Sequence, residues 1–120
     1  MKVMVTADGS RVGWKAIDFI ARNQQMFGPR PSITLVHVDE GNAERVMRAA
    51  RTRLNKMRLK CEERILTGKA GQVIANLARR GKYDLIVMSS HGYGAIEQLL
   101  LGSVPSRVLA MCKTPVLLVR

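Results

Sequence analysis

The chain is poor in the residues that mark exported, metal-bound and membrane-spanning proteins. Its two cysteines, Cys61 and Cys112, stand far apart and form neither a disulfide framework nor a Cys-x-x-Cys pair. No stretch approaches the ~20 apolar residues that a membrane helix needs, and the N-terminal segment reaches Asp8 too early to contain the apolar core of a signal peptide. We therefore expect a cytoplasmic protein that does not enter a membrane, with both thiols buried or half-buried.

Aromatic and acidic residues are scarce as well. Aromatic side chains make up 4% of the 120 residues, although single-stranded nucleic acids are usually held by stacking on such rings. Neither a helix-turn-helix nor an RNA-module signature is present, so nucleic acid is not the expected partner. The 9 acidic residues against 20 basic ones give a net charge of +11, which attracts polyanions in general.

Part of this basic excess is concentrated between positions 45 and 64. Val46, Met47, Ala50, Leu54 and Met57 would share one face of a helix, and cations would cover the rest of its surface. A solvated face, a docking face for an acidic protein and, least favoured, a nucleic-acid surface remain open for it. The eight basic residues are Arg45, Arg48, Arg51, Arg53, Lys56, Arg58, Lys60 and Arg64.

Short apolar runs alternate with stretches of helical periodicity, which predicts strands and helices in turn. The predicted strands are residues 3–5, 33–38, 85–88 and 116–119, with the more polar 61–66 as an edge strand. Because the four apolar runs are nearly continuous, both faces of their sheet should be covered. We expect Gly81 to cap the helix that contains Val73 and Leu77, and Ser103 to be the N-cap of the last helix.

The fold predicted from this alternation is α/β, with one open five-stranded parallel sheet and helices on both faces, in a single domain over residues 1–120. In such Rossmann-like sheets, ligands bind beyond the carboxyl ends of the strands, where the strand order reverses. The segments to consider are residues 6–10, 38–41, 66–71 and 89–103.

The last of these segments carries features of an anion-binding loop. It leaves a predicted buried strand, passes Gly92 and Gly94, and enters a helix at Gly102-Ser103. Glycines allow backbone N–H groups to approach an anion, and a helix N-terminus adds unpaired donors. The Walker and dinucleotide-binding patterns both fail, since neither the Gly-Lys-Ser/Thr sequence nor a third glycine is in place.

The loop instead resembles that of the universal stress protein family, whose nucleotide-binding members carry Gly-x2-Gly-x9-Gly-Ser/Thr. Gly92, nine intervening residues and then Gly102-Ser103 match this pattern, but Ser89 replaces its first glycine. Ser89 either weakens the site or donates its hydroxyl to a phosphate in place of that glycine. The segments 3–10, 37–39 and 114–120 resemble the family too, so the likeness spans the chain.

The resemblance implies the strand order 3-2-1-4-5 and an ATP site. Asp8 would lie near adenosine, the backbone of Val38 would contact adenine, and the glycine loop would surround ribose and phosphates. Asp8 is also a candidate Mg²⁺ ligand together with the phosphates of ATP. The expected cofactor-binding residues are Asp8, Gly9, Val38, Ser89, Ser90, His91, Gly92, Gly102, Ser103 and Val104.

Several residues of these segments also have a purely structural interpretation. The segment 8–10 can be a turn with a helix cap, and Gly92 and Gly94 can be turn glycines. His37 lies in an apolar run and is expected to be a core or sheet-end histidine. His91 can lie beside a phosphate or face solvent.

Little or no catalysis is expected. No catalytic triad can be assembled from the sequence, and His91 and Glu97 are the only nearby bases that could activate water, so ATP hydrolysis should be slow at most. The nucleotide would then act as a signal that alters partner binding. The alternative is a dimeric interaction module that binds no nucleotide. The resemblance implies a homodimer paired through the last strand, Val116, Leu117, Leu118 and Val119.

Overall fold

The computed structural model describes residues 1–91 and 101–120, and over these residues strands and helices alternate as predicted. Apolar runs with β-branched residues form the strands, and the amphipathic stretches between them form the helices. In chain order the elements are β1 (Lys2–Thr6), α1 (Trp14–Arg22), the short 3-10 helix η1 (Gln24–Phe27), β2 (Ser32–Val38), α2 (Ala43–Lys56), β3 (Glu62–Leu66), α3 (Ala70–Gly81), β4 (Leu85–Ser89), α4 (Ser103–Met111) and β5 (Val116–Val119).

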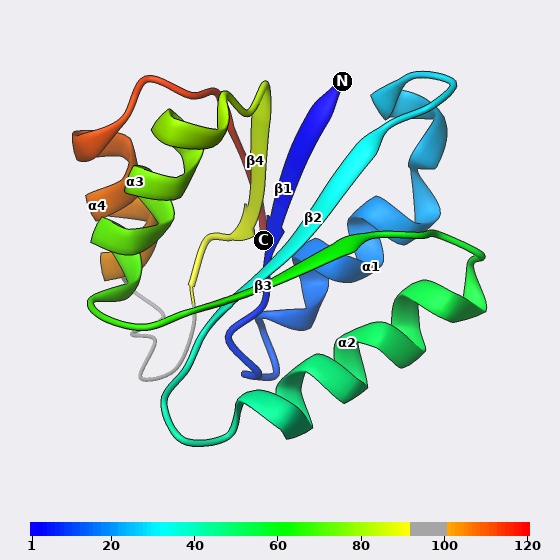
Figure 1. Cartoon of the computed structure of the whole chain (residues 1–120), viewed down its shortest axis with the longest axis horizontal. Coiled ribbons are helices and arrows are strands. Elements are labelled where there is room, and N and C mark those ends of the chain that lie inside the picture. The colour runs from blue at the N-terminus through cyan, green and yellow to red at the C-terminus, as the bar shows by residue number, and fades with distance from the viewer. Residues whose placement is uncertain (92–100) are drawn as a thin grey trace.

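The five strands form one parallel sheet in the order β3-β2-β1-β4-β5, which confirms the predicted fold (Figure 1). Val5 of β1 is in register with Leu35 of β2 and with Val87 of β4, so the centre of the sheet is built from apolar residues. The polar strand β3 lies at one edge, as its sequence predicts, and β5 lies at the other. The chain order reverses between β1 and β4, so the switch point falls at the carboxyl ends of these two strands.

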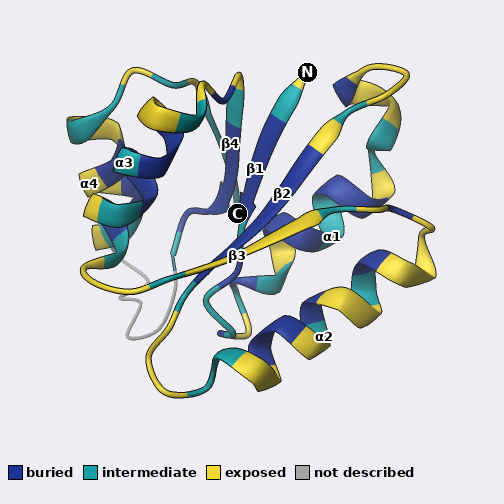
Figure 2. Ribbon diagram, in the orientation of Figure 1, coloured by how far each residue is buried: buried dark blue, intermediate teal, exposed yellow. Residues whose placement is uncertain are grey.

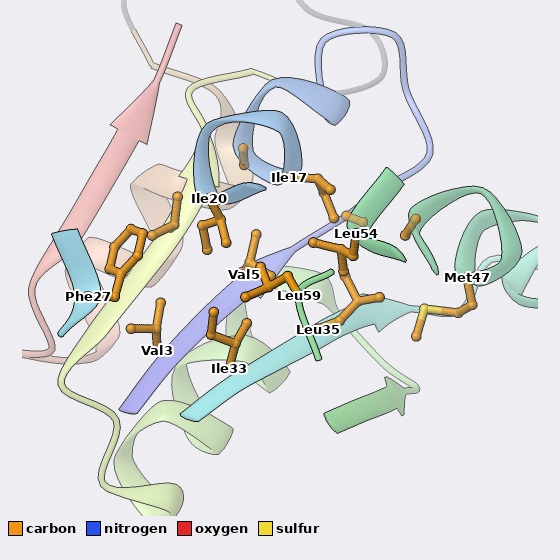
Figure 3. Packing of buried hydrophobic residues seen from close by; sticks show 14 of the residues in the cluster. Val3, Val5, Ile17, Ile20, Phe27, Ile33, Leu35, Met47, Leu54 and Leu59 are labelled. Carbon is orange, nitrogen blue, oxygen red and sulfur yellow. The ribbon is translucent and has the colours of Figure 1, made fainter. Parts of the chain in front are cut away.

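Helices cover both faces of the sheet. Val3, Val5 and Leu35 point toward α1 and α2 and pack with the buried side chains of those helices, as Figure 3 shows for Ile17, Ile20, Met47 and Leu54. On the other face, Met4, Val36 and Ile86 pack against Ile74 and Leu77 of α3 and Val108 of α4. The sheet is therefore buried between two layers of helices, whereas β3 is largely exposed (Figure 2).

Two predicted helix caps are wrong. Gly81 is the last residue of α3, and Lys82 takes the left-handed cap conformation with φ 53°. A Cβ on Gly81 would lie 2.5 Å from Cε2 of Tyr83, so the glycine is needed for the packing of that ring. The N-cap of α4 is Gly102, and Ser103 is the first helical residue. Glycine suits the N-cap here because a Cβ at this position would lie 3.0 Å from the carbonyl oxygen of Ser90 and 3.2 Å from the Cα of His91.

The basic segment 45–64 is also not one helix. Helix α2 ends at Lys56, because Arg58 adopts a left-handed backbone with φ 55° and Leu59 turns back to donate its N–H to the carbonyl of Leu54. Lys60 lies in the connection to β3, and Arg64 lies on β3 itself. The cations of this segment are therefore spread over a helix, a loop and an edge strand.

Within residues 1–91 and 101–120, no helix is long and apolar enough to cross a membrane. Both cysteines in this part of the chain are free and half-buried, as expected.

Candidate functional site

The loops that follow β1, β2 and β3 lie together along the lower edge of the sheet in Figure 1, where the chain also leaves β4. The edge is held by backbone hydrogen bonds that continue past the ends of the strands. The N–H of Ala7 donates to the carbonyl of Val36 at 2.9 Å, and the N–H of Ser90 donates to the carbonyl of Val119 at 3.0 Å. The carboxyl edge is thus a fixed frame for the residues that the sequence singles out.

The segment after β1 forms a tight turn around the Asp8 carboxylate. Asp8 Oδ1 accepts a hydrogen bond of 2.8 Å from the N–H of Ser10, and Gly9 between them has φ 82°. The hydroxyl of Ser10 in turn accepts from the N–H of Gly13, the N-cap residue of α1, at 2.9 Å. This confirms the turn at 8–10, but the N-cap of α1 is Gly13 and no side chain of the segment 8–10 caps the helix. Of the two carboxylate oxygens of Asp8, only Oδ1 accepts a hydrogen bond from a described residue, which leaves Oδ2 for a further donor.

Ser89 closes the opposite side of this turn. It is the last residue of β4, and its side chain is buried. Its hydroxyl lies 2.9 Å from the carbonyl oxygen of Val12 and 3.2 Å from that of Gly13, and donates to them. The residue that departs from the glycine pattern therefore ties the end of β4 to the start of α1.

Ser90 and His91 connect β4 to the last helix. The N–H of Gly102 donates to the carbonyl of Ser90 at 2.6 Å, and the hydroxyl of Ser90 lies 3.0 Å from Nδ1 of His91. A Cβ on Gly102 would lie 3.0 Å from the Ser90 carbonyl oxygen, which is closer than a side chain normally tolerates. Gly92, Gly94 and Glu97 lie outside the described residues.

Helix α4 begins directly at this contact. In a helix of this length the first N–H groups have no intrahelical acceptor, so those of Ser103 and Val104 are donors at the helix N-terminus. The Gly102 carbonyl already accepts from the N–H of Ser106 at 3.1 Å and from its hydroxyl at 2.8 Å. Backbone donors and a helix dipole therefore meet at the carboxyl end of β4, and this arrangement suits an anion.

Val38 is the last residue of β2, the strand next to β1, which precedes Asp8. The neighbouring residue, His37, links the two strand ends. His37 is buried, which confirms the prediction of a core or sheet-end histidine. Its Nδ1 lies 2.7 Å from the carbonyl oxygen of Ala7. Because a carbonyl only accepts, Nδ1 must carry the proton, and the buried Nε2 has no hydrogen-bond partner among the described residues.

Three of the eight basic residues of segment 45–64 form ion pairs with carboxylates away from the carboxyl edge of the sheet. Arg53 donates to both carboxylate oxygens of Asp18 and lies 4.9 Å from the ring centre of Trp14, so it joins α2 to α1. Arg51 makes a two-pronged hydrogen bond to Glu63 of β3, and this bond lowers the pKa of the glutamate. Arg48 pairs with Glu44 at the exposed surface of α2. Burial raises the pKa of the Cys61 thiol close by, which disfavours its thiolate form.

No group of three or more metal-binding side chains occurs in the described part of the chain. Asp8 is the only carboxylate among the predicted site residues, so a divalent cation here would need the phosphates of its ligand as further donors.

The sequence anticipates Asp8, Ser90 and Gly102 at one edge, but it gives no indication of the partners of Ser89. Val12 and Gly13 take part through their backbone carbonyls, and a carbonyl leaves no signal in residue type. The one available signal is Gly13 itself: a Cβ there would overlap the carboxylate of Asp8 and lie 2.9 Å from the Ser10 hydroxyl.

The sequence profile of the universal stress protein family matches residues 40–120. The chain belongs to this family. A universal stress protein of Thermus aquaticus, encoded in the QAH/OAS sulfhydrylase 3′ region, is 38% identical over 86 residues, which cover 68% of this chain and 63% of that protein. The chain spans less than two thirds of the length of the curated relatives that it matches.

Solved structures of the family share the fold. The protein MJ0577 of Methanocaldococcus jannaschii superposes with a TM-score of 0.85 at 24% identity, over 98% of this chain and 94% of that one. A universal stress protein crystallised in complex with cAMP superposes with a TM-score of 0.81 at 29% identity, over all of this chain and 96% of that one.

Proposed function

We propose that the protein binds an adenine nucleotide, ATP, at the carboxyl edge of its sheet and acts in the stress response as a nucleotide-dependent switch, with little or no hydrolysis. The observation that carries the proposal is the 2.6 Å hydrogen bond from Gly102 to Ser90. It brings the N-terminal donors of α4 to the end of β4, beside the turn that holds Asp8. The universal stress protein solved with cAMP supports an adenine nucleotide as the ligand class.

Each part of the ligand has a chemically suitable partner. Oδ2 of Asp8 accepts from a ribose hydroxyl, and the Val38 backbone at the end of β2 pairs with the edge of adenine. Gly9, Ser90, His91 and Gly92 line the ligand, and the N–H groups of Ser103 and Val104 donate to phosphate oxygens. Mg²⁺, where it accompanies ATP, would be held by Asp8 and the phosphates, and it would neutralise phosphate charge.

We extend this proposal to the domain as a whole, to its location in the cell and to a protein partner. Residues 1–120 form one universal stress protein domain, although the family profile begins at residue 40. The two free, half-buried thiols are compatible with the cytoplasm as its location. The cations of segment 45–64 other than Arg48, Arg51 and Arg53, which are paired with carboxylates, would offer a docking face to an acidic protein.

Nucleotide binding is tested by identifying any nucleotide that co-purifies and then titrating ATP into the stripped protein by calorimetry. Gly102→Ala and Asp8→Ala should each weaken binding about tenfold or more, because each removes a close approach or a charged acceptor worth roughly 1.4 kcal/mol. Asp84→Ala is the matched control, since that carboxylate accepts from the N–H of Lys2 at the other end of the sheet.

Absence of a bound nucleotide, of binding heat and of thermal stabilisation by ATP would refute the proposal. The alternative of a dimeric interaction module without nucleotide would then hold.

A homodimer through β5 is the second part of the proposal. All four residues of this strand are half-buried, and among the described elements it pairs only with β4, so an apolar edge is left for a second copy. Sedimentation at micromolar concentration should give twice the chain mass of 13.3 kDa. A strictly monomeric mass would exclude this assembly.

A further inference from the structure

Ser89 links two segments that are far apart in the sequence. Its buried hydroxyl donates to the carbonyl oxygens of Val12 and Gly13, 77 and 76 positions away. A serine hydroxyl has one proton, so these two acceptors share it. Because this proton is shared between protein carbonyls, the hydroxyl is oriented toward the β1–α1 connection.

The connection that Ser89 holds is also the one that supports Asp8. Gly13 packs so closely on the Asp8 side chain that any Cβ at this position would overlap Oδ1. The N–H of Gly13 is fixed by the Ser10 hydroxyl, and the N–H of Ser10 is fixed by Oδ1. Ser89, Gly13, Ser10 and Asp8 therefore form a continuous chain of contacts from the end of β4 to the carboxylate.

The consequence lies in the direction of the remaining carboxylate oxygen. Oδ1 is engaged by the turn and packs against Gly13, whose carbonyl accepts from the Ser89 hydroxyl at 3.2 Å, so a shift of this peptide would also move Oδ2. A hydrogen bond to a ribose hydroxyl is sensitive to such shifts, since it weakens steeply when its angle or length departs from ideal.

We propose that Ser89 is a positioning residue of the nucleotide site, which acts through Gly13 to aim the Asp8 carboxylate at the ribose hydroxyls. It thereby sets the preference of the site for ribonucleotides over deoxyribonucleotides. This inference rests on the proposed nucleotide binding, and it assigns the replacement of glycine by Ser89 a role in recognising the sugar.

The test compares the dissociation constants of ATP, 2′-deoxy-ATP and 3′-deoxy-ATP for the full chain and its variants by calorimetry. The original protein should favour ATP over at least one deoxy form by about tenfold, the value of one hydrogen bond to a charged group. Ser89→Ala should reduce this ratio to below threefold and change the affinity for that deoxy form by less than threefold.

Two further variants separate positioning from general loss of structure. Gly13→Ala displaces the carboxylate directly and should abolish the same ratio. In the Asp8→Ala background, Ser89→Ala should have no further effect on ATP affinity, as expected for two residues that act through one contact. Thr52→Ala is the matched control, because it removes an exposed hydroxyl that donates to the Arg48 carbonyl on α2.

The outcomes distinguish this inference from the function on which it rests. If no adenine nucleotide binds the original protein, the proposed function fails. If ATP binds but the ribose ratio is absent from the original protein, or is retained in Ser89→Ala, or if Ser89→Ala weakens ATP and both deoxy forms equally, the positioning role of Ser89 is overturned.

Discussion

At the scale of single residues, the side chains at the carboxyl edge are held by hydrogen bonds to backbone groups. Amino-acid composition does not reveal these contacts. The sequence indicates that Asp8 lies at the end of a strand, but only the structure places its Oδ1 on the N–H of Ser10. The hydroxyl of Ser89 could not be assigned from sequence because its acceptors are the carbonyls of Val12 and Gly13, which any residue carries. The left-handed backbone of Arg58 was equally unpredictable, since residues other than glycine and asparagine rarely adopt it.

Glu63 offers a pH-dependent test at this scale. The hydrogen bond from Arg51 lowers its pKa in the folded state, so the pair stabilises the fold above the ordinary glutamate pKa of about 4.3. This stabilisation is lost as the pH falls through the lowered pKa. In urea unfolding, the difference in midpoint between the original protein and Glu63→Gln should be constant near pH 7 and should shrink at acid pH. Arg51→Gln, which removes the other partner, should lose its difference over the same range; a difference that persists unchanged near pH 2 would contradict this assignment.

At the scale of elements, the sequence is a better guide. The apolar runs predict each strand to within about one residue, because continuous aliphatic stretches between helices are typical of a sheet buried on both faces. Helix ends are predicted less well. Gly102 instead of Ser103 caps α4, and Lys82 instead of Gly81 caps α3, because contacts with Ser90 and Tyr83 decide which residue must lack a Cβ. Such contacts come from distant segments, and local propensity does not contain them.

The contact between α3 and α4 depends on Gly71. A Cβ at this buried position would lie 2.5 Å from the Cβ of Arg107 and 3.3 Å from the carbonyl oxygen of Val104, so the helices would have to move apart. Replacing an exposed helical glycine by alanine usually raises the free energy of unfolding by up to ~1 kcal/mol. Gly71→Ala should instead lower the free energy of unfolding by about 1–3 kcal/mol in urea titrations, the usual cost of overpacking. A more stable variant would show that the two helices are not in close contact here.

The packing of α1 on α2 gives a matched pair of charge variants. The side chains of Arg53 and Asp18 are 39% and 37% exposed, whereas those of Arg48 and Glu44 are 71% and 87% exposed. Arg53 also lies over Trp14. Arg53→Ala should therefore reduce the free energy of unfolding by about 1 kcal/mol, and Arg48→Ala by less than about 0.5 kcal/mol. Equal losses in chemical unfolding followed by circular dichroism would refute the view that Arg53 holds α2 against α1.

At the scale of the whole molecule, the excess basic charge and the proposed binding site lie in different parts of the chain. The net charge of +11 would suggest a polyanion surface, yet the segment 89–103 contains no lysine or arginine, and the proposed anion contacts are backbone N–H groups. The sheet order and the location of the edge follow from the sequence through its alternation of elements and its family resemblance. The dispersal of segment 45–64 does not follow, because the turn at Arg58 and the pairing of Glu63 with Arg51 depend on tertiary structure.

This separation predicts weak, salt-sensitive binding to nucleic acid. Arg48, Arg51 and Arg53 are engaged by carboxylates, so fewer cations of segment 45–64 can release counterions from a phosphate backbone. Because counterion release weakens such binding steeply as salt rises, a labelled DNA duplex should bind at about 20 mM salt and should be released by about 150 mM. Binding that survives the higher salt would instead identify a specific nucleic-acid surface.

The central claim is that an adenine nucleotide occupies the carboxyl edge of the sheet between the β1 turn and the N-terminus of α4. The most direct measurement is an amide chemical-shift titration of the ¹⁵N-labelled, nucleotide-free protein with ATP. We predict saturable shifts at Gly9, Ser10, Ser90, Ser103 and Val104, and none at Asp84 or along the exposed face of α2. Shifts confined to α2, or no saturable shift at the carboxyl edge, would contradict the account.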